Sequence, residues 1–153
     1  AHFHMFGEAY EFEPAQLAKF TTAGQLPAVL DFAFQGRVQA VVADGRPATN
    51  LSYLFEADAV YAKGAETAKQ LPTFLGNHDM GRFAMFIKRA RPDISDAELA
   101  SRVILGHAMM MFSRGVPTIY YGDEQGFVSD GNDQDARETM FPSQTAVYLD
   151  NDL

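Results

Sequence analysis

The chain has 153 residues, a formal net charge of −8, 47% hydrophobic residues and no cysteine. This size and apolar content predict one ordinary domain with a core of its own and exclude a disordered chain. The acidic balance argues against nucleic-acid binding, and the lack of cysteine excludes disulfides, thiolate metal sites and cysteine nucleophiles. No apolar run approaches the roughly 20 residues of a membrane helix, so no membrane partner is expected, and the compartment stays open.

Short apolar runs alternate with amphipathic stretches along the chain. The apolar runs are predicted as strands at His2–Phe6, Leu26–Phe32, Leu71–Leu75 and Val116–Tyr121. Helices are predicted at Pro14–Thr22, Asn50–Lys63 and Arg82–Ala90, and from Ser95 to about Ser113. Strands separated by helices predict right-handed crossovers and a parallel sheet.

The longest predicted helix carries two local patterns. Ser95 and Glu98 form a capping box, in which the Ser hydroxyl accepts from the Glu amide and the Glu side chain reaches back. Met109–Met111 and Phe112 lie near its far end, and we interpret them as core packing. Residues 126–139, rich in Gly, Asp and Asn, are predicted as a long polar loop.

Acidic residues follow three of the predicted strands, at Glu8, Asp79 and Asp123-Glu124. Active sites of parallel α/β folds are built at the carboxyl ends of the strands. Glu8 lies between Phe6 and Tyr10, whose rings can desolvate its carboxyl, as suits a general acid. The alternative is a solvated loop glutamate.

The run Asn77-His78-Asp79 places three hydrogen-bonding side chains directly after a predicted strand. Asp79 could accept hydrogen bonds from a hydroxyl-rich ligand and His78 could donate to one. The alternative is that Asp79 caps the next helix and His78 is a packed core residue.

A second alternative is a metal site. His2 and His4 alternate on a predicted strand and so face one side, and with His78 and Asp79 they could form a metal-dependent barrel hydrolase. No further histidine is suitably placed, so packing is the simpler interpretation of the first two. No phosphate loop and no Gly-x-Ser-x-Gly elbow occurs in the sequence.

Taken together, five stretches resemble the α-amylase family of glycoside hydrolases, in the family's order. They are MFGEAYEF at 5–12, VLDFAFQG at 29–36, FLGNHDMGR at 74–82, GVPTIYYGDEQG at 115–126 and GNDQDARETMFP at 131–142. The first four are similar to the segments at the fifth to eighth barrel strands, and the last is similar to the loop after them. The resemblance implies half of a (β/α)₈ TIM barrel, strands five to eight, as one partial catalytic domain over residues 1–153 with no second domain.

The resemblance also implies roles for individual residues. Glu8 would be the general acid/base, and Asp79 the second carboxylate that holds sugar hydroxyls and stabilises the transition state. His78 and Asn77 would bind substrate, and Arg137 would contact sugar or pair with an acid. Asp123 and Glu124 would shape the rim of the site.

The function that the resemblance implies is retaining hydrolysis, or transfer, at α-glucosidic bonds of starch-like glucans or oligosaccharides. The family's Asp nucleophile follows the fourth strand, and no such segment is present, so the chain alone is expected to be inactive. A non-catalytic sugar-binding remnant remains an alternative. No cofactor is expected in this segment, calcium would bind in the missing part of the parent protein, and the open sheet edges predict self-association.

Overall fold

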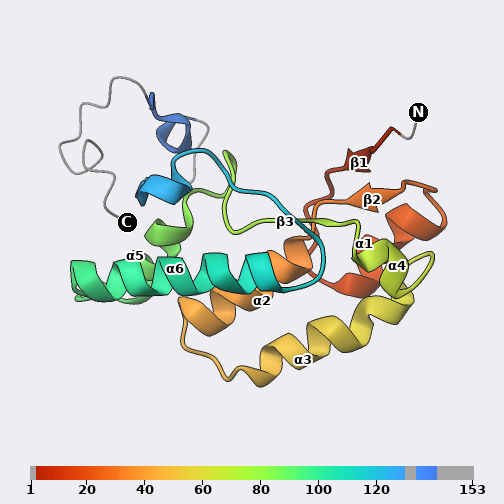
Figure 1. Cartoon of the computed structure of the whole chain (residues 1–153), viewed down its shortest axis with the longest axis horizontal. Helices are drawn as coiled ribbons and strands as arrows, with labels where there is room; N and C mark the ends of the chain where they lie inside the picture. Colours follow the sequence, from red (N-terminus) through yellow and green to blue (C-terminus); the bar gives the residue numbers. More distant parts are fainter. Residues whose placement is uncertain (1–2, 130–133, 141–153) are drawn as a thin grey trace.

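Four short strands and the helices between them form the framework of the computed structural model, which describes residues 3–129 and 134–140 (Figure 1). The strands are β1 Phe6–Gly7, β2 Ala28–Val29, β3 Pro72–Thr73 and β4 Val116–Pro117. The helices are α1 Pro14–Thr22, α2 Phe32–Val42, α3 Thr49–Glu56, α4 Ala65–Ala68, α5 Phe83–Ala90 and α6 Asp96–Phe112. Three 3₁₀ turns complete the order, η1 Ala57–Val60, η2 Asp123–Gln125 and η3 Asp135–Arg137.

The strands form two parallel pairs, which confirms the predicted α/β character and strand direction. Phe6 lies opposite Ala28 in the β1–β2 pair, and Pro72 lies opposite Val116 in the β3–β4 pair. The Asp31 amide donates to the Pro72 carbonyl at 2.9 Å and so joins the end of β2 to the start of β3. Each strand is shorter than its predicted apolar run. The first run also begins at His2, which lies outside the described residues.

Helix α2 was not expected from the sequence, and the predicted strand through Phe32 is wrong at its end. The Asp31 carboxylate accepts from the Phe34 amide at 2.9 Å and starts the helix one residue after it. The first helical residues, Phe32 and Phe34, are both fully buried. A helix start that is apolar on every side lacks the 3.6-residue alternation that marks a helix in a sequence, so it resembled a strand.

The other predicted helices are present, one of them shortened. Helix α1 keeps its predicted bounds and has proline in its first turn. The predicted helix at Asn50–Lys63 is interrupted, because α3 ends at Glu56 and η1 follows. In α6 the Ser95 hydroxyl caps the Glu98 amide at 3.3 Å, whereas the Glu98 carboxylate accepts from Arg102 Nε at 2.8 Å and does not reach back.

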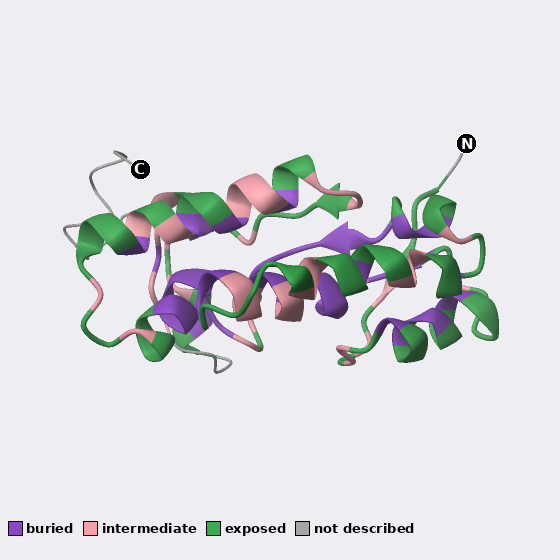
Figure 2. Cartoon of the chain, turned by 90° about the horizontal axis from the view of Figure 1, so that it is seen from below, coloured by how far each residue is buried: buried purple, intermediate pink, exposed green. Residues whose placement is uncertain are grey.

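The hydrophobic core lies between the helices and the strands, and Figure 2 shows the buried segments running through the middle of the molecule. Met110 faces this core, but Met111 is half exposed and Phe112 is 91% exposed. The interpretation of all these residues as core packing is therefore wrong for two of them. Consecutive residues of a helix point about 100° apart, so a run of apolar residues cannot all face one core.

Both outer strands leave apolar side chains uncovered. Phe3, Met5 and Phe6 are exposed at β1, and Val116 and Ile119 are exposed at β4. Within the part of the chain that the structure describes, β1 and β4 each pair with one strand only. None of the described helices has the length and apolar character needed to cross a membrane.

Candidate functional site

Glu8 is the first residue after β1 and lies in an open groove beside α1. The groove encloses about 340 Å³ and is lined by Glu8, Ala9, Tyr10, Glu11, Gln16, Lys19 and Phe20. Glu8 is exposed, and the flanking Phe6 and Tyr10 are 49% and 70% exposed. The apolar surroundings that the sequence suggested for this carboxyl are therefore not present in the described part of the chain.

Asn77, His78 and Asp79 lie on a tight loop that follows β3. Asn77 and Gly81 exchange backbone hydrogen bonds of 3.2 and 2.9 Å, which closes the base of this loop. The Asn77 side-chain oxygen accepts from the amides of Asp79 and Met80 at 3.0 and 2.7 Å. The first predicted substrate-binding residue, Asn77, thus shapes the loop, and its buried Nδ2 has no hydrogen-bond partner among the described residues.

The tip of the loop presents His78 and Asp79. His78 Nε2 lies 3.2 Å from Asp79 Oδ1, and the two side chains are 41% and 50% exposed. The alternative interpretations of this run are both wrong. Helix α5 is preceded by Arg82 and has no side-chain cap, so Asp79 does not cap it, and His78 is not a core residue.

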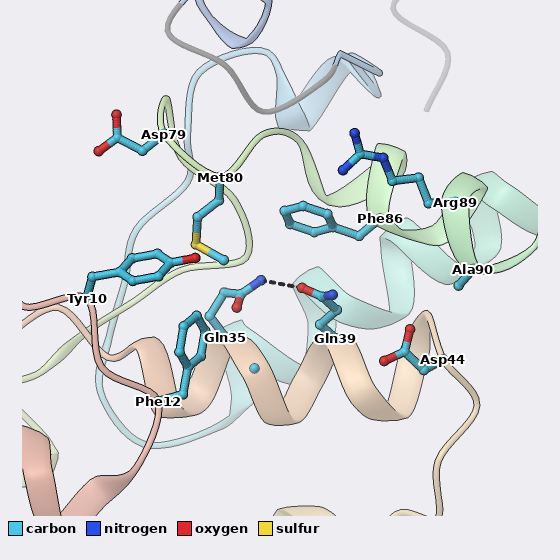
Figure 3. Close-up of a pocket in the computed structure, with 11 residues that line it drawn as sticks. Tyr10, Phe12, Gln35, Gln39, Asp44, Asp79, Met80, Phe86, Arg89 and Ala90 are labelled. Atoms are coloured by element: carbon cyan, nitrogen blue, oxygen red, sulfur yellow. Dashed lines mark hydrogen bonds between the residues drawn. The ribbon is translucent and has the colours of Figure 1, made fainter.

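Asp79 lines a second and larger groove, between α2 and α5. This groove encloses about 710 Å³, and Tyr10, Phe12, Gln35, Gln39, Asp44, Met80, Phe86 and Arg89 also line it. Figure 3 shows Tyr10, Phe12 and Met80 grouped around Gln35, whose amide donates to Gln39 at 2.9 Å, while the Asp79 carboxylate points away from them. Glu8 and Asp79 thus border neighbouring grooves, and Tyr10 lines both.

A buried arginine lies beneath the loop. Arg82 is fully buried, and its guanidinium donates to Asp123 Oδ1 at 3.0 Å, to Glu138 Oε2 at 2.9 Å and to the Tyr121 carbonyl. Three rings surround it, with centroids 4.3 to 5.3 Å from the guanidinium carbon, from Tyr120, Tyr121 and Phe127. We call Arg82 with these two carboxylates and three rings the Arg82 cluster.

Burial and the neighbouring charges shift the pKa values of Asp123 and Arg82 in opposite directions. Burial raises the pKa of Asp123 to about 7, although Arg82 opposes that rise. Burial alone would lower the pKa of Arg82, but its bonds to Glu138 and Asp123 outweigh this and raise it. The arginine therefore stays charged, while Asp123 changes its charge in the neutral pH range.

The turns after β4 place the remaining predicted residues. Asp123 was expected at the rim, but it is 4% exposed and paired with Arg82, so the expectation is wrong for this residue. The Glu124 carboxylate accepts from the Gly122 amide at 2.8 Å. Arg137 ends η3 and is exposed. Burial raises the pKa of Tyr120, and the nearby charge of Arg137 opposes that rise.

A second arginine, Arg114, has a side chain that is 11% exposed and joins the chain just before β4 to the residue that starts α2. The Arg114 guanidinium bonds the fully buried Asp31 carboxylate, and its Nε lies 2.9 Å from Asp58 Oδ1. Tyr61 packs beside them, and its buried hydroxyl has no partner in the described part of the chain. Burial raises the pKa of Asp31, with Arg114 opposing. We call Arg114, Asp31, Asp58 and Tyr61 the Arg114 cluster.

The metal interpretation finds no support in the geometry. Across residues 3–129 and 134–140, no group of three or more His, Asp or Glu side chains is placed to hold a metal ion. His4 is exposed, with its ring centroid 6.1 Å from that of Phe6, and His2 lies outside the described residues.

Sequence reasoning assigned no role to Arg82, Asp31 or Arg114, although the first two stand in quoted motifs. The sequence does contain an indication that Asp31 and Arg82 are buried and paired. Asp31 stands between Leu30 and Phe32, and Arg82 precedes the apolar run that begins at Phe83. A charged residue next to a buried segment requires a partner of opposite charge, and the partners come from distant parts of the chain.

Comparisons with known proteins agree on one family. The family model "Alpha amylase, catalytic domain" matches residues 1–152. An α-amylase of Streptomyces lividans is 46% identical over 150 residues, covering 98% of this chain and 16% of that protein. A cyclomaltodextrin glucanotransferase of Niallia circulans is 37% identical over 125 residues, covering 78% of this chain and 15% of its own.

The solved structures agree with the sequence comparisons. The α-amylase of Geobacillus thermoleovorans in complex with acarbose superposes with a TM-score of 0.76 at 21% identity, covering 97% of this chain and 32% of that one. This likeness shows the fold alone. The chain spans about one sixth of the length of the curated relatives named above.

Proposed function

Since the chain belongs to the α-amylase catalytic-domain family, we propose that it is part of a retaining glycosidase or transglycosylase that acts on α-glucosidic bonds. The substrates in this proposal are starch-like glucans or oligosaccharides. The relatives include both an α-amylase and a cyclomaltodextrin glucanotransferase, so hydrolysis and transfer both fall within it.

The observation that carries the proposal is where the acidic residues lie. Glu8 directly follows β1, and the loop with His78 and Asp79 follows β3, each strand being parallel to its neighbour. These are the positions at which parallel α/β folds build active sites. Asp79 and His78 are half exposed at a loop tip, so both can reach a ligand.

In the proposed mechanism Glu8 donates a proton to the leaving glycosidic oxygen and later takes one from the attacking water or sugar hydroxyl. Asp79 accepts hydrogen bonds from sugar hydroxyls and places negative charge near the oxocarbenium-like ring, and His78 and Asn77 help to hold the sugar. Arg137 contacts sugar at the rim. The Asp nucleophile is supplied by polypeptide outside these residues, so the chain alone turns over no glucan.

The same proposal covers the architecture. We propose that residues 1–153 supply strands five to eight of a (β/α)₈ barrel as one partial catalytic domain. The parallel pairs and the superposition of 97% of this chain on 32% of an α-amylase chain support this assignment. A whole barrel typically takes about 250 residues. Calcium, where the parent protein uses it, would bind outside this segment.

The uncovered apolar side chains at β1 and β4 also support self-association of the isolated chain. Sedimentation velocity over a range of concentrations would show it as a rising average mass. A chain that stays monomeric throughout would contradict this part of the proposal.

The assignment of Glu8 is tested by Glu8→Gln in the longer protein that carries this segment. Loss of the proton donor should lower kcat on maltotriose by about 10²–10⁴-fold. Glu11→Gln is the matched control, because Glu11 lines the same groove and is changed in the same way. Near-normal turnover by Glu8→Gln would show that the acid/base lies elsewhere.

A further inference from the structure

Arg82 stands where the loop that carries His78 and Asp79 ends and α5 begins. The loop is closed one residue earlier by the Asn77–Gly81 hydrogen bonds. The Arg82 amide donates to the Ser129 carbonyl at 3.3 Å, and the guanidinium bonds Tyr121, Asp123 and Glu138. Both the backbone and the side chain of one residue therefore bind the chain after β4.

The segment that Arg82 binds is itself held together by its tyrosines. Tyr120 Oη donates to the Ala136 carbonyl at 2.8 Å, and Tyr121 Oη donates to the Glu138 carbonyl at 2.9 Å. These bonds fold η3 back against the chain before η2, and in Figure 1 the two blue turns lie together at the end of the molecule opposite β1 and β2. Arg82 lies inside this fold, with its guanidinium carbon 4.3 and 4.9 Å from the centroids of the Tyr120 and Tyr121 rings.

We propose that Arg82 is a positioning residue that fixes the 77–81 loop against residues 120–129 and 134–138 and thereby sets the orientation of His78 and Asp79. The fully buried guanidinium cannot reach a bound sugar, so its effect passes through the loop. The consequence for catalysis rests on the proposed function, whereas the consequence for the loop does not.

The chemistry of the Arg82 cluster requires arginine. The guanidinium carries five donors in a plane and is here bonded on three sides, while its faces lie against aromatic rings. A lysine would keep the charge but offers one nitrogen, which cannot bond Asp123, Glu138 and the Tyr121 carbonyl in the same geometry. Arg82→Lys therefore keeps the positive charge and removes the hydrogen bonds that position the loop.

The test is the histidine NMR spectrum of the 153-residue chain, with the His78 ring signal assigned by its loss in His78→Gln. Arg82→Lys should shift and broaden the His78 signal. Arg114→Lys is the matched control, since the Arg114 side chain is only 11% exposed and pairs with two carboxylates that lie outside the loop. It should leave the His78 signal in place while lowering the unfolding temperature.

A milder variant covers the case in which Arg82→Lys does not fold. Glu138 is 25% exposed, so Glu138→Gln removes one of the Arg82 bonds with less disturbance of the core. It should shift the His78 signal in the same direction and by less. An unchanged His78 signal in folded Arg82→Lys, or in Glu138→Gln where Arg82→Lys does not fold, would overturn the proposal.

The catalytic consequence is measured separately in the longer protein. Misplacement of groups that act in the transition state lowers kcat more than it changes KM, so Arg82→Lys should lose about 10²-fold in kcat at a similar KM. A shifted His78 signal together with normal turnover in Glu8→Gln would leave the positioning role intact and refute the proposed function. An unchanged His78 signal together with lost turnover in Glu8→Gln would refute the positioning role and leave the proposed function intact.

Discussion

The Arg82 cluster and the Arg114 cluster use the same chemistry at two places in the fold. Each has one arginine that is at most 11% exposed, two carboxylates and at least one aromatic ring within reach. In the Arg114 cluster the carboxylates come from the end of β2 and from η1, which precede the arginine in the chain. In the Arg82 cluster they come from the turns after β4, which follow it.

This difference in position gives the clusters different consequences. Asp31 also starts α2, so the Arg114 cluster joins a helix start, η1 and the chain just before β4. The Arg82 cluster joins two loops that follow strands, and one of them presents His78 and Asp79. Loss of the first should therefore act mainly on stability, and loss of the second mainly on the geometry of the candidate site.

The largest expected effect is on the free energy of unfolding of Arg114→Met. Asp31 is fully buried and would lose its counter-charge, which should cost about 3–5 kcal/mol. Arg82→Met should cost less, about 1–3 kcal/mol, because Glu138 is 25% exposed and can turn to water. Urea unfolding at pH 7 measures both, and equal losses would contradict the comparison.

The second effect concerns pH. The folded pKa of Asp123 is about 7, above its ordinary value of 3.8, so between these values the folded chain binds the proton that the unfolded chain has lost. The unfolding free energy should fall as pH rises from about 4 to about 7, by up to about 1.4 kcal/mol per pH unit, and level off above.

Asp123→Asn removes this contribution and retains the shape of the side chain. The difference in unfolding temperature between the wild type and Asp123→Asn should therefore change across this range and stay constant above it. Asp31 titrates in both proteins, so its contribution cancels. Parallel curves for the two proteins from pH 5 to pH 8 would show that Asp123 does not titrate there.

The smallest expected effect is a difference in stability between Tyr120→Phe in the Arg82 cluster and Tyr61→Phe in the Arg114 cluster. Tyr120 Oη bonds the Ala136 carbonyl, so Tyr120→Phe should cost about 1 kcal/mol. The Tyr61 hydroxyl is buried with no partner in the described part of the chain, so Tyr61→Phe should leave stability unchanged or raise it slightly. Thermal unfolding measures both, and a clear loss in Tyr61→Phe would reveal a partner for that hydroxyl.

Much of the fold could be predicted from local pattern. Helix α1 has proline at its start, and α6 has Ser95 as its cap, so both were expected at their actual positions. Helix α2 was missed, because its first turn is apolar all round and its cap, Asp31, lies inside an apolar run. The strands were expected, but their length depends on neighbouring strands, which no local pattern describes.

The candidate site likewise has features that local motifs predicted and features that depend on tertiary contacts. The motifs predicted Glu8, His78 and Asp79 at strand ends, and in the structure Glu8 directly follows β1, whereas His78 and Asp79 lie on the loop after β3. The surroundings of Glu8 were expected to be apolar and are open, because Phe6 is 49% exposed and Tyr10 is 70% exposed. The burial of Asp123 was missed, since it depends on an arginine 41 residues earlier in the chain.

By itself the sequence determined the family, the alternation of strands and helices and the order of the acidic residues, because these depend on residue identity and on spacing along the chain. Only the tertiary structure decided which charges are buried and paired. A buried charge is stable only beside a partner of opposite charge, and the partners of Arg82 and Arg114 lie between 41 and 83 residues away. Only folding brings residues so far apart in the chain together, so no local pattern of the sequence indicates these pairs.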